Sequence, residues 1–152
     1  MRVGTSTFGP NAGEGLFLKV PAKAGSTVAF YNGVRIPPGE VSPVQNSAYQ
    51  IYLDWTASRV TTSEFLDVLP QHQSLDNYCA SLGHKINHSF EPNCRWDNIE
   101  HPTFGRVPRI VTMVDLEAGE ELTCHYMINI GEAYDHKDFK WYADLWDHMS
   151  AK

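Results

Sequence analysis

Short apolar runs separated by glycine and proline dominate the first third of the chain. One run covers residues 16–20 after the turn at Gly13 and Gly15, and a second covers residues 27–36 and ends at Pro37-Pro38. The second run is rich in β-branched and aromatic residues, and Gly or Pro at both ends is typical of strand boundaries. We therefore predict two short β-strands.

The rest of the chain adds further strand patterns. Residues 49–53 alternate weakly within the less regular stretch 37–70, which suggests one arm of a hairpin. Residues 106–114 and 121–126 also have strand-like composition, and the turn sequence EAGE at 117–120 joins them. The pattern predicts a mainly β protein with many short, mostly antiparallel strands.

Two segments have helical spacing. Ser74 can cap a helix that stops at Gly83, and a last helix opens at Asp135. Their apolar faces are Leu75, Tyr78, Cys79 and Leu82 in the first, and Phe139, Tyr142, Trp146 and Met149 in the second. Trp141 lies off the second face, which favours a separate role for its ring.

Length and charge narrow the class of protein. The chain has 152 residues and a net charge of −6, which suits one domain and argues against direct nucleic-acid binding, since that needs a basic face. A negative surface permits a basic protein or peptide as partner. No apolar run reaches the length of a membrane span, and no leader opens the chain. We expect no membrane association.

Three cysteines, Cys79, Cys94 and Cys124, are widely spaced. An odd count without CxxC pairs is a poor disulfide framework and a poor zinc site. We therefore expect reduced thiols that act as small buried apolar residues.

The segment GHKINHSFEPNCRWD at residues 83–97 concentrates side chains that carry chemistry. His84 and His88 are four residues apart, as metal ligands on a helix are, but Gly83 and Pro92 make a continuous helix there unfavourable. Ser89 lacks the G-x-S-x-G context of a hydrolase nucleophile. We expect neither a metal site nor hydrolytic chemistry.

Residues 87–94 (NHSFEPNC) resemble the central motif of SET-domain protein lysine methyltransferases. Residues 13–17 (GEGLF) resemble the N-terminal cofactor motif of the family, and 118–123 (AGEELT) followed by Tyr126 resemble its C-terminal motif. Residues 30–36 and 78–85 are most similar to the histone lysine monomethyltransferases that carry MORN repeats ahead of the SET domain. This sequence contains no such repeats.

The resemblance implies a SET fold of several short antiparallel sheets with a pseudoknot, few short helices and a C-terminal aromatic helix. Residues 1–134 would form the SET domain, and 135–152 a cofactor-packing helix of the same unit. The threaded segment would bring Asn87 and His88 beside Tyr126.

The resemblance also implies methyl transfer from S-adenosylmethionine to a lysine amine. Tyr126 and Tyr31 would be the catalytic residues, at the end of a channel for the substrate lysine. Members of the family bind the cofactor through positions that correspond here to Ala12, Gly13, Glu14, Lys85, Asn87, His88 and Trp141.

Two channel positions depart from the MORN-containing members, which have tyrosine at both. Trp96 and Ile128 stand there instead, and the channel loses two hydroxyl groups. An alternative is therefore a catalytically weak or inactive SET module that binds cofactor or a protein tail. An unrelated β-rich interaction domain is a third hypothesis.

The implied partner is a lysine-containing protein or histone tail, and the implied location is intracellular and nuclear. Residues 37–70 resemble the family poorly, so the choice of substrate cannot be carried over. Neither the number of methyl groups added nor the oligomeric state follows from the sequence.

Overall fold

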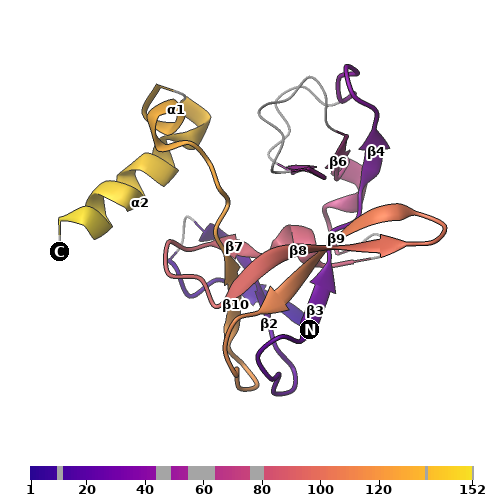
Figure 1. Cartoon of the computed structure of the whole chain (residues 1–152). Helices are drawn as coiled ribbons and strands as arrows, with labels where there is room; N and C mark the ends of the chain where they lie inside the picture. Colours follow the sequence, from indigo (N-terminus) through magenta and orange to yellow (C-terminus); the bar gives the residue numbers. More distant parts are fainter. Residues whose placement is uncertain (10–11, 44–48, 55–63, 76–80, 136, 152) are drawn as a thin grey trace.

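The computed structural model describes residues 1–9, 12–43, 49–54, 64–75, 81–135 and 137–151. Strands dominate these residues and form three small sheets, while the helices gather at the C-terminal end (Figure 1). The SET fold predicted from the resemblance is confirmed in this respect. No helix of the described part is long and apolar enough to span a membrane.

The first sheet holds the motif residues. Its strands, in spatial order, are β1 (Arg2–Thr5), β2 (Glu14–Phe17), β10 (Glu121–Cys124) and β7 (Asn87–His88). The pairs β1–β2 and β2–β10 are antiparallel, whereas β7 pairs with β10 in parallel. The parallel pair places residues 87–88 beside 123–124, so it brings His88 next to Tyr126. The threaded loop that the resemblance implies stays a prediction.

The second sheet consists of β3 (Thr27–Phe30), β9 (Gly105–Thr112) and β8 (Cys94–His101). β8 and β9 form a long antiparallel hairpin. Its residue pairs run from Cys94 opposite Thr112 to His101 opposite Gly105. The prediction of a strand at 106–114 is confirmed, but β8 was missed because its polar residues give no clear alternation.

The third sheet has the order β4 (Val34–Ile36), β6 (Phe65–Asp67), β5 (Gln50–Tyr52), all antiparallel. The single strand predicted for 27–36 is therefore wrong: it splits into β3 and β4, which belong to different sheets. Gly33 lies at the break, where a β-carbon would sit 2.5 Å from the Asp67 carbonyl oxygen. This close backbone approach requires glycine.

The main core lies between the first two sheets. It includes Leu16, Leu122 and Ile110, none of which is exposed, together with Cys94 and Cys124. The expectation of buried, free thiols is confirmed for these two cysteines, and burial raises the pKa of Cys94 to about 12. Cys79 lies outside the described residues.

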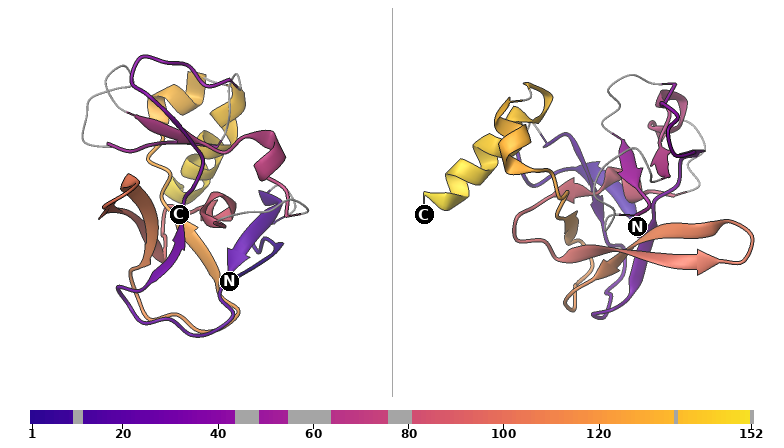
Figure 2. Two further views of the ribbon diagram at one scale, coloured as in Figure 1. Left: turned by 90° about the vertical axis from the view of Figure 1, so that its right-hand side faces the viewer. Right: turned by 45° about the horizontal axis from the view of Figure 1, so that its top comes forward.

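The C-terminal helices differ from the prediction. A single helix from Asp135 is wrong, because α1 (Ile130–Asp135) ends there and α2 (Lys140–Ser150) begins after the 3-10 turn η4 (Lys137–Phe139). Ala133 of α1 packs on Tyr142 and Ala143 of α2. This helix pair lies to one side of the sheets, and the β8–β9 hairpin points away from it (Figures 1 and 2).

The helix predicted from Ser74 lies largely outside the described residues, because 76–80 are not described. Ser74 and Leu75 form a bend and a turn after the 3-10 turn η2 (Pro70–His72). Gly83 does not stop a helix but begins the 3-10 turn η3 (Gly83–Lys85). A β-carbon on Gly83 would lie 2.4 Å from the Phe30 carbonyl oxygen, so glycine allows η3 to pack against β3.

Candidate active site

A pocket of about 230 Å³ opens between the N-terminal cofactor motif and η3. Six of the predicted site residues line it: Ala12, Gly13, Glu14, Lys85, Asn87 and Tyr126. Three further lining residues, Tyr49, His84 and Ile86, were not predicted. The structure therefore brings motifs from both ends of the chain to one cavity.

Tyr126 follows β10 and closes one side of this pocket. Its hydroxyl donates to the Ile86 carbonyl oxygen at 2.5 Å, and its backbone N–H donates to His88 Nδ1 at 3.1 Å. The side chain is 37% exposed, yet its hydroxyl lies deep. Burial, aided by nearby Cys124 and Tyr49, raises the pKa of Tyr126. The phenol thus stays protonated at neutral pH.

Asn87 is held in one orientation by two acceptors. Its Nδ2 donates to the Glu14 carbonyl oxygen and to Glu121 Oε1, each at 3.0 Å. Both neighbours accept only, so the amide nitrogen must face them. Its Oδ1 receives no donor from the described residues and remains available as an acceptor.

Glu121 is a supporting residue that sequence reasoning missed. Its carboxylate is 9% exposed and accepts from Ser6 Oγ at 2.8 Å, from the Thr7 N–H at 2.7 Å and from Thr7 Oγ1 at 2.6 Å, besides Asn87. Burial alone raises the pKa of Glu121, but the hydrogen bonds from Thr7, Asn87 and Ser6 outweigh it and lower this pKa overall. Its position before Leu122 in the C-terminal motif was a usable signal.

Gly15 lets β2 approach the Glu121 carboxylate closely. A β-carbon on Gly15 would lie 2.2 Å from Glu121 Oε1 and 3.3 Å from Asn87 Nδ2. The absence of a side chain at Gly15 therefore keeps Glu121 and Asn87 in contact.

Lys85 and Glu14 supply opposite charges at the pocket. Lys85 Nζ lies 2.7 Å from Glu14 Oε2, and the Lys85 side chain is 10% exposed against 54% for Glu14. An ammonium group has three donors, so Lys85 can hold Glu14 and a second anionic group together.

His84 has an unsatisfied ring nitrogen at the same pocket. The residue is 8% exposed, and its Nε2 is buried without a hydrogen-bond partner. Its ring meets Tyr49 edge-on at 6.1 Å between centroids. Burial and the neighbouring Lys85 lower the pKa of His84, so the ring is neutral at pH 7.

His88 lies at the centre of an aromatic cluster rather than on the pocket wall. Its ring is 6% exposed and packs on Phe90 at 4.4 Å, Tyr142 at 4.6 Å, Tyr126 at 5.4 Å and Trp141 at 6.0 Å. This cluster joins the helix pair to the sheet. In this cluster the ring of Trp141 also contacts the ring of Tyr126 edge-on, with 6.2 Å between their centroids.

Acidification should destabilise the protein through His88. Burial, with help from His125, lowers the pKa of His88 from 6.5 to about 4, so between these values the unfolded chain binds a proton that the folded chain excludes. The contribution of His88 to the free energy of unfolding is therefore fully present above pH 6.5. It falls by roughly 2–3 kcal/mol as the pH drops toward 4. Urea unfolding from pH 7.5 to 4.5 measures this slope.

The matched variants are His88→Gln and His148→Gln, since His148 is exposed on α2. We expect a shallower slope in the first and the wild-type slope in the second. Part of the slope remains in His88→Gln, because burial also lowers the pKa values of His84 and His125. Equal slopes in all three proteins would contradict this role of His88.

The predicted channel residues Tyr31 and Trp96 are in contact. Their rings meet edge-on at 5.8 Å; Tyr31 donates its hydroxyl to the Tyr49 carbonyl oxygen at 2.8 Å, and Trp96 Nε1 donates to the His125 carbonyl oxygen at 3.1 Å. Burial, with a smaller effect of Tyr126, raises the pKa of Tyr31. Tyr31 and Trp96 thus form an aromatic pair, and the Tyr126 phenol lies near enough to influence the Tyr31 hydroxyl.

Ile128 packs instead against the helix cluster that contains Ala133, Tyr142 and Ala143. Its place in the channel stays a prediction. No group of three His, Cys, Asp or Glu side chains in the described part of the chain is arranged to hold a metal ion.

Comparison with known proteins places this geometry in a family. A family model for the SET domain matches residues 13–127, which include all three motifs, the Tyr31–Trp96 pair and every lining residue of the pocket except Ala12. The chain belongs to the SET domain family. The SET domain thus accounts for the convergence of 13–17, 87–94 and 118–126 at one cavity.

One relative and one solved structure show how far the likeness extends. The histone-lysine N-methyltransferase SETD7 of Halocynthia roretzi is 44% identical over 133 residues, covering 85% of this chain and 31% of that protein. The chain therefore spans less than a third of this relative. A crystal structure of a Plasmodium falciparum protein assigned as a histone methyltransferase matches with a TM-score of 0.57 at 17% identity, over 84% of this chain and 97% of that one. This structural similarity supports the SET fold of the chain.

SET methyltransferases generally use S-adenosylmethionine, and the residues of the pocket fit its amino-acid end. That end is a zwitterion, which needs both donors and acceptors. Lys85 offers donors, whereas the Asn87 Oδ1 and the orphaned His84 Nε2 offer polar atoms that no described residue satisfies. Buried polar atoms without partners are unusual in a folded protein, so the His84 Nε2 is an atom with which a polar group of the cofactor could pair.

Proposed function

We propose that this SET domain is a protein lysine N-methyltransferase that uses S-adenosylmethionine. The observation that carries the proposal is Tyr126, which lines the pocket and whose hydroxyl is fixed on the Ile86 carbonyl oxygen. A lysine amine bound beside Tyr126 would hydrogen-bond the Tyr126 hydroxyl and the Ile86 carbonyl oxygen in place of water.

The proposed cofactor supplies a methyl group on a positively charged sulfur. Ala12, Gly13 and Glu14 would bind it from one side through backbone groups, and Lys85, Asn87 and His88 from the other. Trp141 would cover the adenine ring, so that residues 135–152 form a cofactor-packing segment of the same unit. The contacts of Trp141 with His88 and Tyr126 support this arrangement.

The channel residues would make the lysine reactive. A free lysine amine has a pKa near ~10.4 and lacks a lone pair when protonated. Aromatic walls from Tyr31 and Trp96 exclude water, and burial next to a cation favours the neutral amine. Because burial raises the pKa values of Tyr126 and Tyr31, their hydroxyls act as orienting groups and not as bases. Such alignment contributes on the order of several kcal/mol.

The edge of β5 that faces away from β6 is our proposed peptide groove. The Tyr49 carbonyl accepts from the Val68 N–H, and the Leu53 N–H donates to Glu64, so both face β6. Backbone groups alternate in direction along an antiparallel strand, and those of Gln50 and Tyr52 therefore face away. No described strand pairs with this edge, so an extended peptide can add to it.

Trp141→Ala should weaken S-adenosylmethionine binding about 10-fold, as expected for losing one stacked ring. Stability should change little, since Trp141 is 45% exposed. Trp146→Ala is the matched control: it lies on the same helix, is 42% exposed and packs on Phe90 instead. Calorimetric titration gives both affinities. Equal loss in the two variants would remove Trp141 from the cofactor site.

The proposed substrate is a lysine-containing protein or histone tail, and the proposed location is the nucleus, with a role in chromatin regulation. The histone-lysine methyltransferase identity of the Halocynthia relative supports both proposals, and the net charge of −6 suits a basic tail. Incubation with nuclear and cytosolic protein extracts and a labelled methyl donor tests them. Labelling confined to cytosolic proteins would contradict them.

A second candidate is a SET module that binds cofactor or a protein tail without efficient transfer. The observation in its favour is Trp96, whose single donor is used by the His125 carbonyl oxygen and cannot orient an amine. Titration of S-adenosylmethionine into the protein tests the cofactor half of both candidates. Saturable one-to-one binding supports the cofactor half of both candidates. Absence of binding to the folded protein contradicts the methyltransferase and leaves a module that binds a protein tail.

A further inference from the structure

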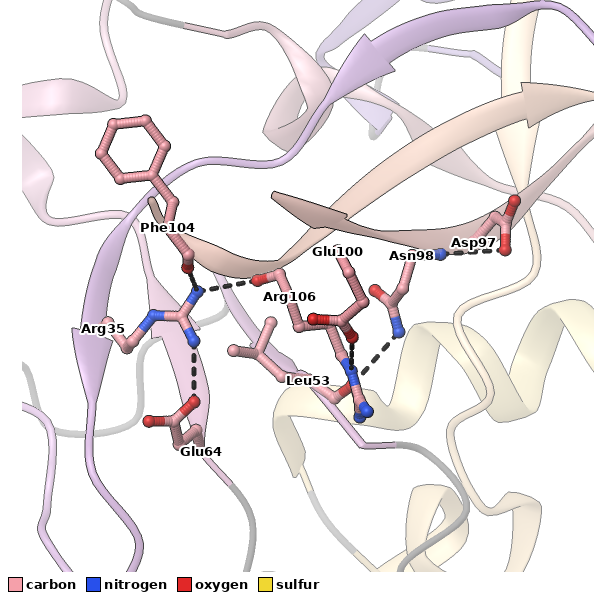
Figure 3. Close-up of polar contacts among 8 residues, drawn as sticks. All are labelled: Arg35, Leu53, Glu64, Asp97, Asn98, Glu100, Phe104 and Arg106. Atoms are coloured by element: carbon pink, nitrogen blue, oxygen red, sulfur yellow. Dashed lines mark hydrogen bonds and ion pairs between the residues drawn. The ribbon is translucent and has the colours of Figure 1, made fainter. Parts of the chain in front are cut away.

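The strand β5 is held at both ends by side chains of other elements. Directly before β5, the Tyr49 carbonyl oxygen accepts from the hydroxyl of the channel residue Tyr31 at 2.8 Å. Directly after it, the Leu53 carbonyl oxygen accepts from two side chains of the β8–β9 hairpin. These donors are Arg106 Nη1 at 3.3 Å and Asn98 Nδ2 at 3.2 Å (Figure 3). β5 therefore connects the proposed lysine channel with the hairpin.

Arg35 on β4 forms a second connection between the third sheet and the hairpin (Figure 3). Its Nη1 donates to Glu64 Oε2 at 2.7 Å, and its Nη2 donates to the carbonyl oxygens of Phe104 at 2.9 Å and Arg106 at 2.7 Å. A guanidinium group is planar and holds its donors in a fixed fork. Arg35 can therefore satisfy all three acceptors only while the third sheet and the hairpin keep one relative orientation.

A cavity of about 360 Å³ lies between these two elements. Its lining includes Arg35, Leu53 and Glu64 from the third sheet and its flanks, and Glu100 and Arg106 from the hairpin. Apolar side chains that fill a space fix the elements around it, and here the space is not filled. The hydrogen bonds of the two arginines therefore set the orientation of the third sheet at this point.

The orientation of the third sheet bears on the proposed channel. The proposed peptide edge of β5 lies between Tyr49 and Leu53, whereas the channel residue Trp96 lies on β8 of the hairpin. Tyr31, the second channel residue, packs with these three residues in one apolar cluster. A fixed angle between β5 and the hairpin therefore aligns a peptide bound on β5 with the channel.

We propose that Arg35 and Arg106 are positioning residues for methyl transfer, because they hold the peptide-binding edge of β5 in line with the lysine channel. The inference rests on the proposed function. Neither arginine lines the cofactor pocket, so their effect falls on the peptide and not on S-adenosylmethionine. They act through the backbone of β5 and the hairpin, and they do not contact the reacting atoms.

Arg35→Lys is the first test. Lysine keeps the positive charge beside Glu64 but lacks the fork that reaches both carbonyl oxygens. For a lysine-containing histone-tail peptide, we expect KM from mass spectrometry and Kd from fluorescence anisotropy to rise about tenfold. The kcat should stay near its wild-type value, because the channel itself is unchanged. The Kd of S-adenosylmethionine, measured by calorimetry, should not change. Arg106→Lys should shift the same constants in the same direction.

Glu64→Gln and Arg109→Lys are the matched controls, and both should keep the wild-type KM. Glu64→Gln removes the ion pair and leaves the two bonds from Arg35 to the hairpin carbonyls. The Arg109 side chain is 31% exposed, against 33% for Arg35, and it also binds a carboxylate. Its partner, Asp97, lies on β8, so this pair does not connect the hairpin to the third sheet.

Hydrogen exchange of the protein without ligands gives a measurement that needs no activity. Arg35→Lys should speed exchange of the amides at 50–53 and 103–106 and leave β2 and β10 unchanged. Unchanged exchange, an unchanged peptide KM and Kd, or an equal rise of KM in Arg109→Lys would overturn the positioning role. If the wild type binds the peptide without transferring a methyl group, the proposed function fails. A loss of peptide affinity confined to Arg35→Lys and Arg106→Lys would then still support the role of the arginines.

Discussion

Replacing Tyr126 by phenylalanine should lower methyl transfer about 100-fold or more while S-adenosylmethionine binding stays near its wild-type value. The substitution removes one oxygen and keeps the ring. That oxygen is the group that donates to the Ile86 carbonyl, and both residues line the pocket. Without it, the amine loses its fixed orientation relative to the transferred methyl group. Turnover under saturating peptide, measured by mass spectrometry, gives the loss.

Tyr134→Phe is the matched control for this prediction. The Tyr134 hydroxyl hydrogen-bonds to Asp147 on the outer side of the helix pair, and the residue is 55% exposed. The lost hydrogen bond of Tyr126 should cost about 1 kcal/mol of folding stability, so thermal melting separates misfolding from lost chemistry. Unchanged turnover in a folded Tyr126→Phe protein would remove Tyr126 from the catalytic site.

Glu121→Gln should destabilise the fold by about 3 kcal/mol and weaken S-adenosylmethionine binding together. The carboxylate satisfies donors on Ser6, Thr7 and Asn87, and an amide would direct two of its own donors at them. Asn87 would then lose its fixed orientation. Urea unfolding and calorimetric titration measure the two effects.

The neighbouring variant Glu120→Gln is the control, because Glu120 is exposed and its carboxylate accepts from the Glu117 N–H. The pH dependence adds a second test. The pKa of Glu121 is lowered in the folded state. Its contribution to folding stability is therefore present above the pKa of the unfolded state, 4.5, and is lost as the pH falls through the pKa of the folded state. Glu121→Gln should therefore lose less stability below pH 4.5 than the wild type. Equal acid sensitivity would contradict this account.

The positions of Asn87, Tyr126 and the 13–15 loop at one pocket follow from motifs that the sequence displays in order. The supporting residues do not. His84 and Tyr49 reach the pocket only because Gly33 and Gly83 permit close backbone approaches to Asp67 and Phe30, and such contacts leave no periodic signal.

The strand errors have the same origin. Residues 27–36 have uniform strand composition, but the chain changes sheets at Gly33 because the Asp67 backbone occupies the space of a side chain. β8 pairs with β9 without interruption, but its sequence is largely polar, and the side chains of Trp96 and Asn98 hydrogen-bond the carbonyls of His125 and Leu53. Tertiary contacts, which no local pattern encodes, decide both elements.

Methyl transfer itself is the most direct test of the central claim. The folded protein is incubated with S-adenosylmethionine that has a deuterated methyl group and with a mixture of lysine-containing histone-tail peptides, and the products are analysed by mass spectrometry. We predict a mass increase of one or more labelled methyl groups located on lysine, absent in Tyr126→Phe. Saturable cofactor binding without labelling of any lysine peptide or extract protein would contradict the claim and favour the binding module.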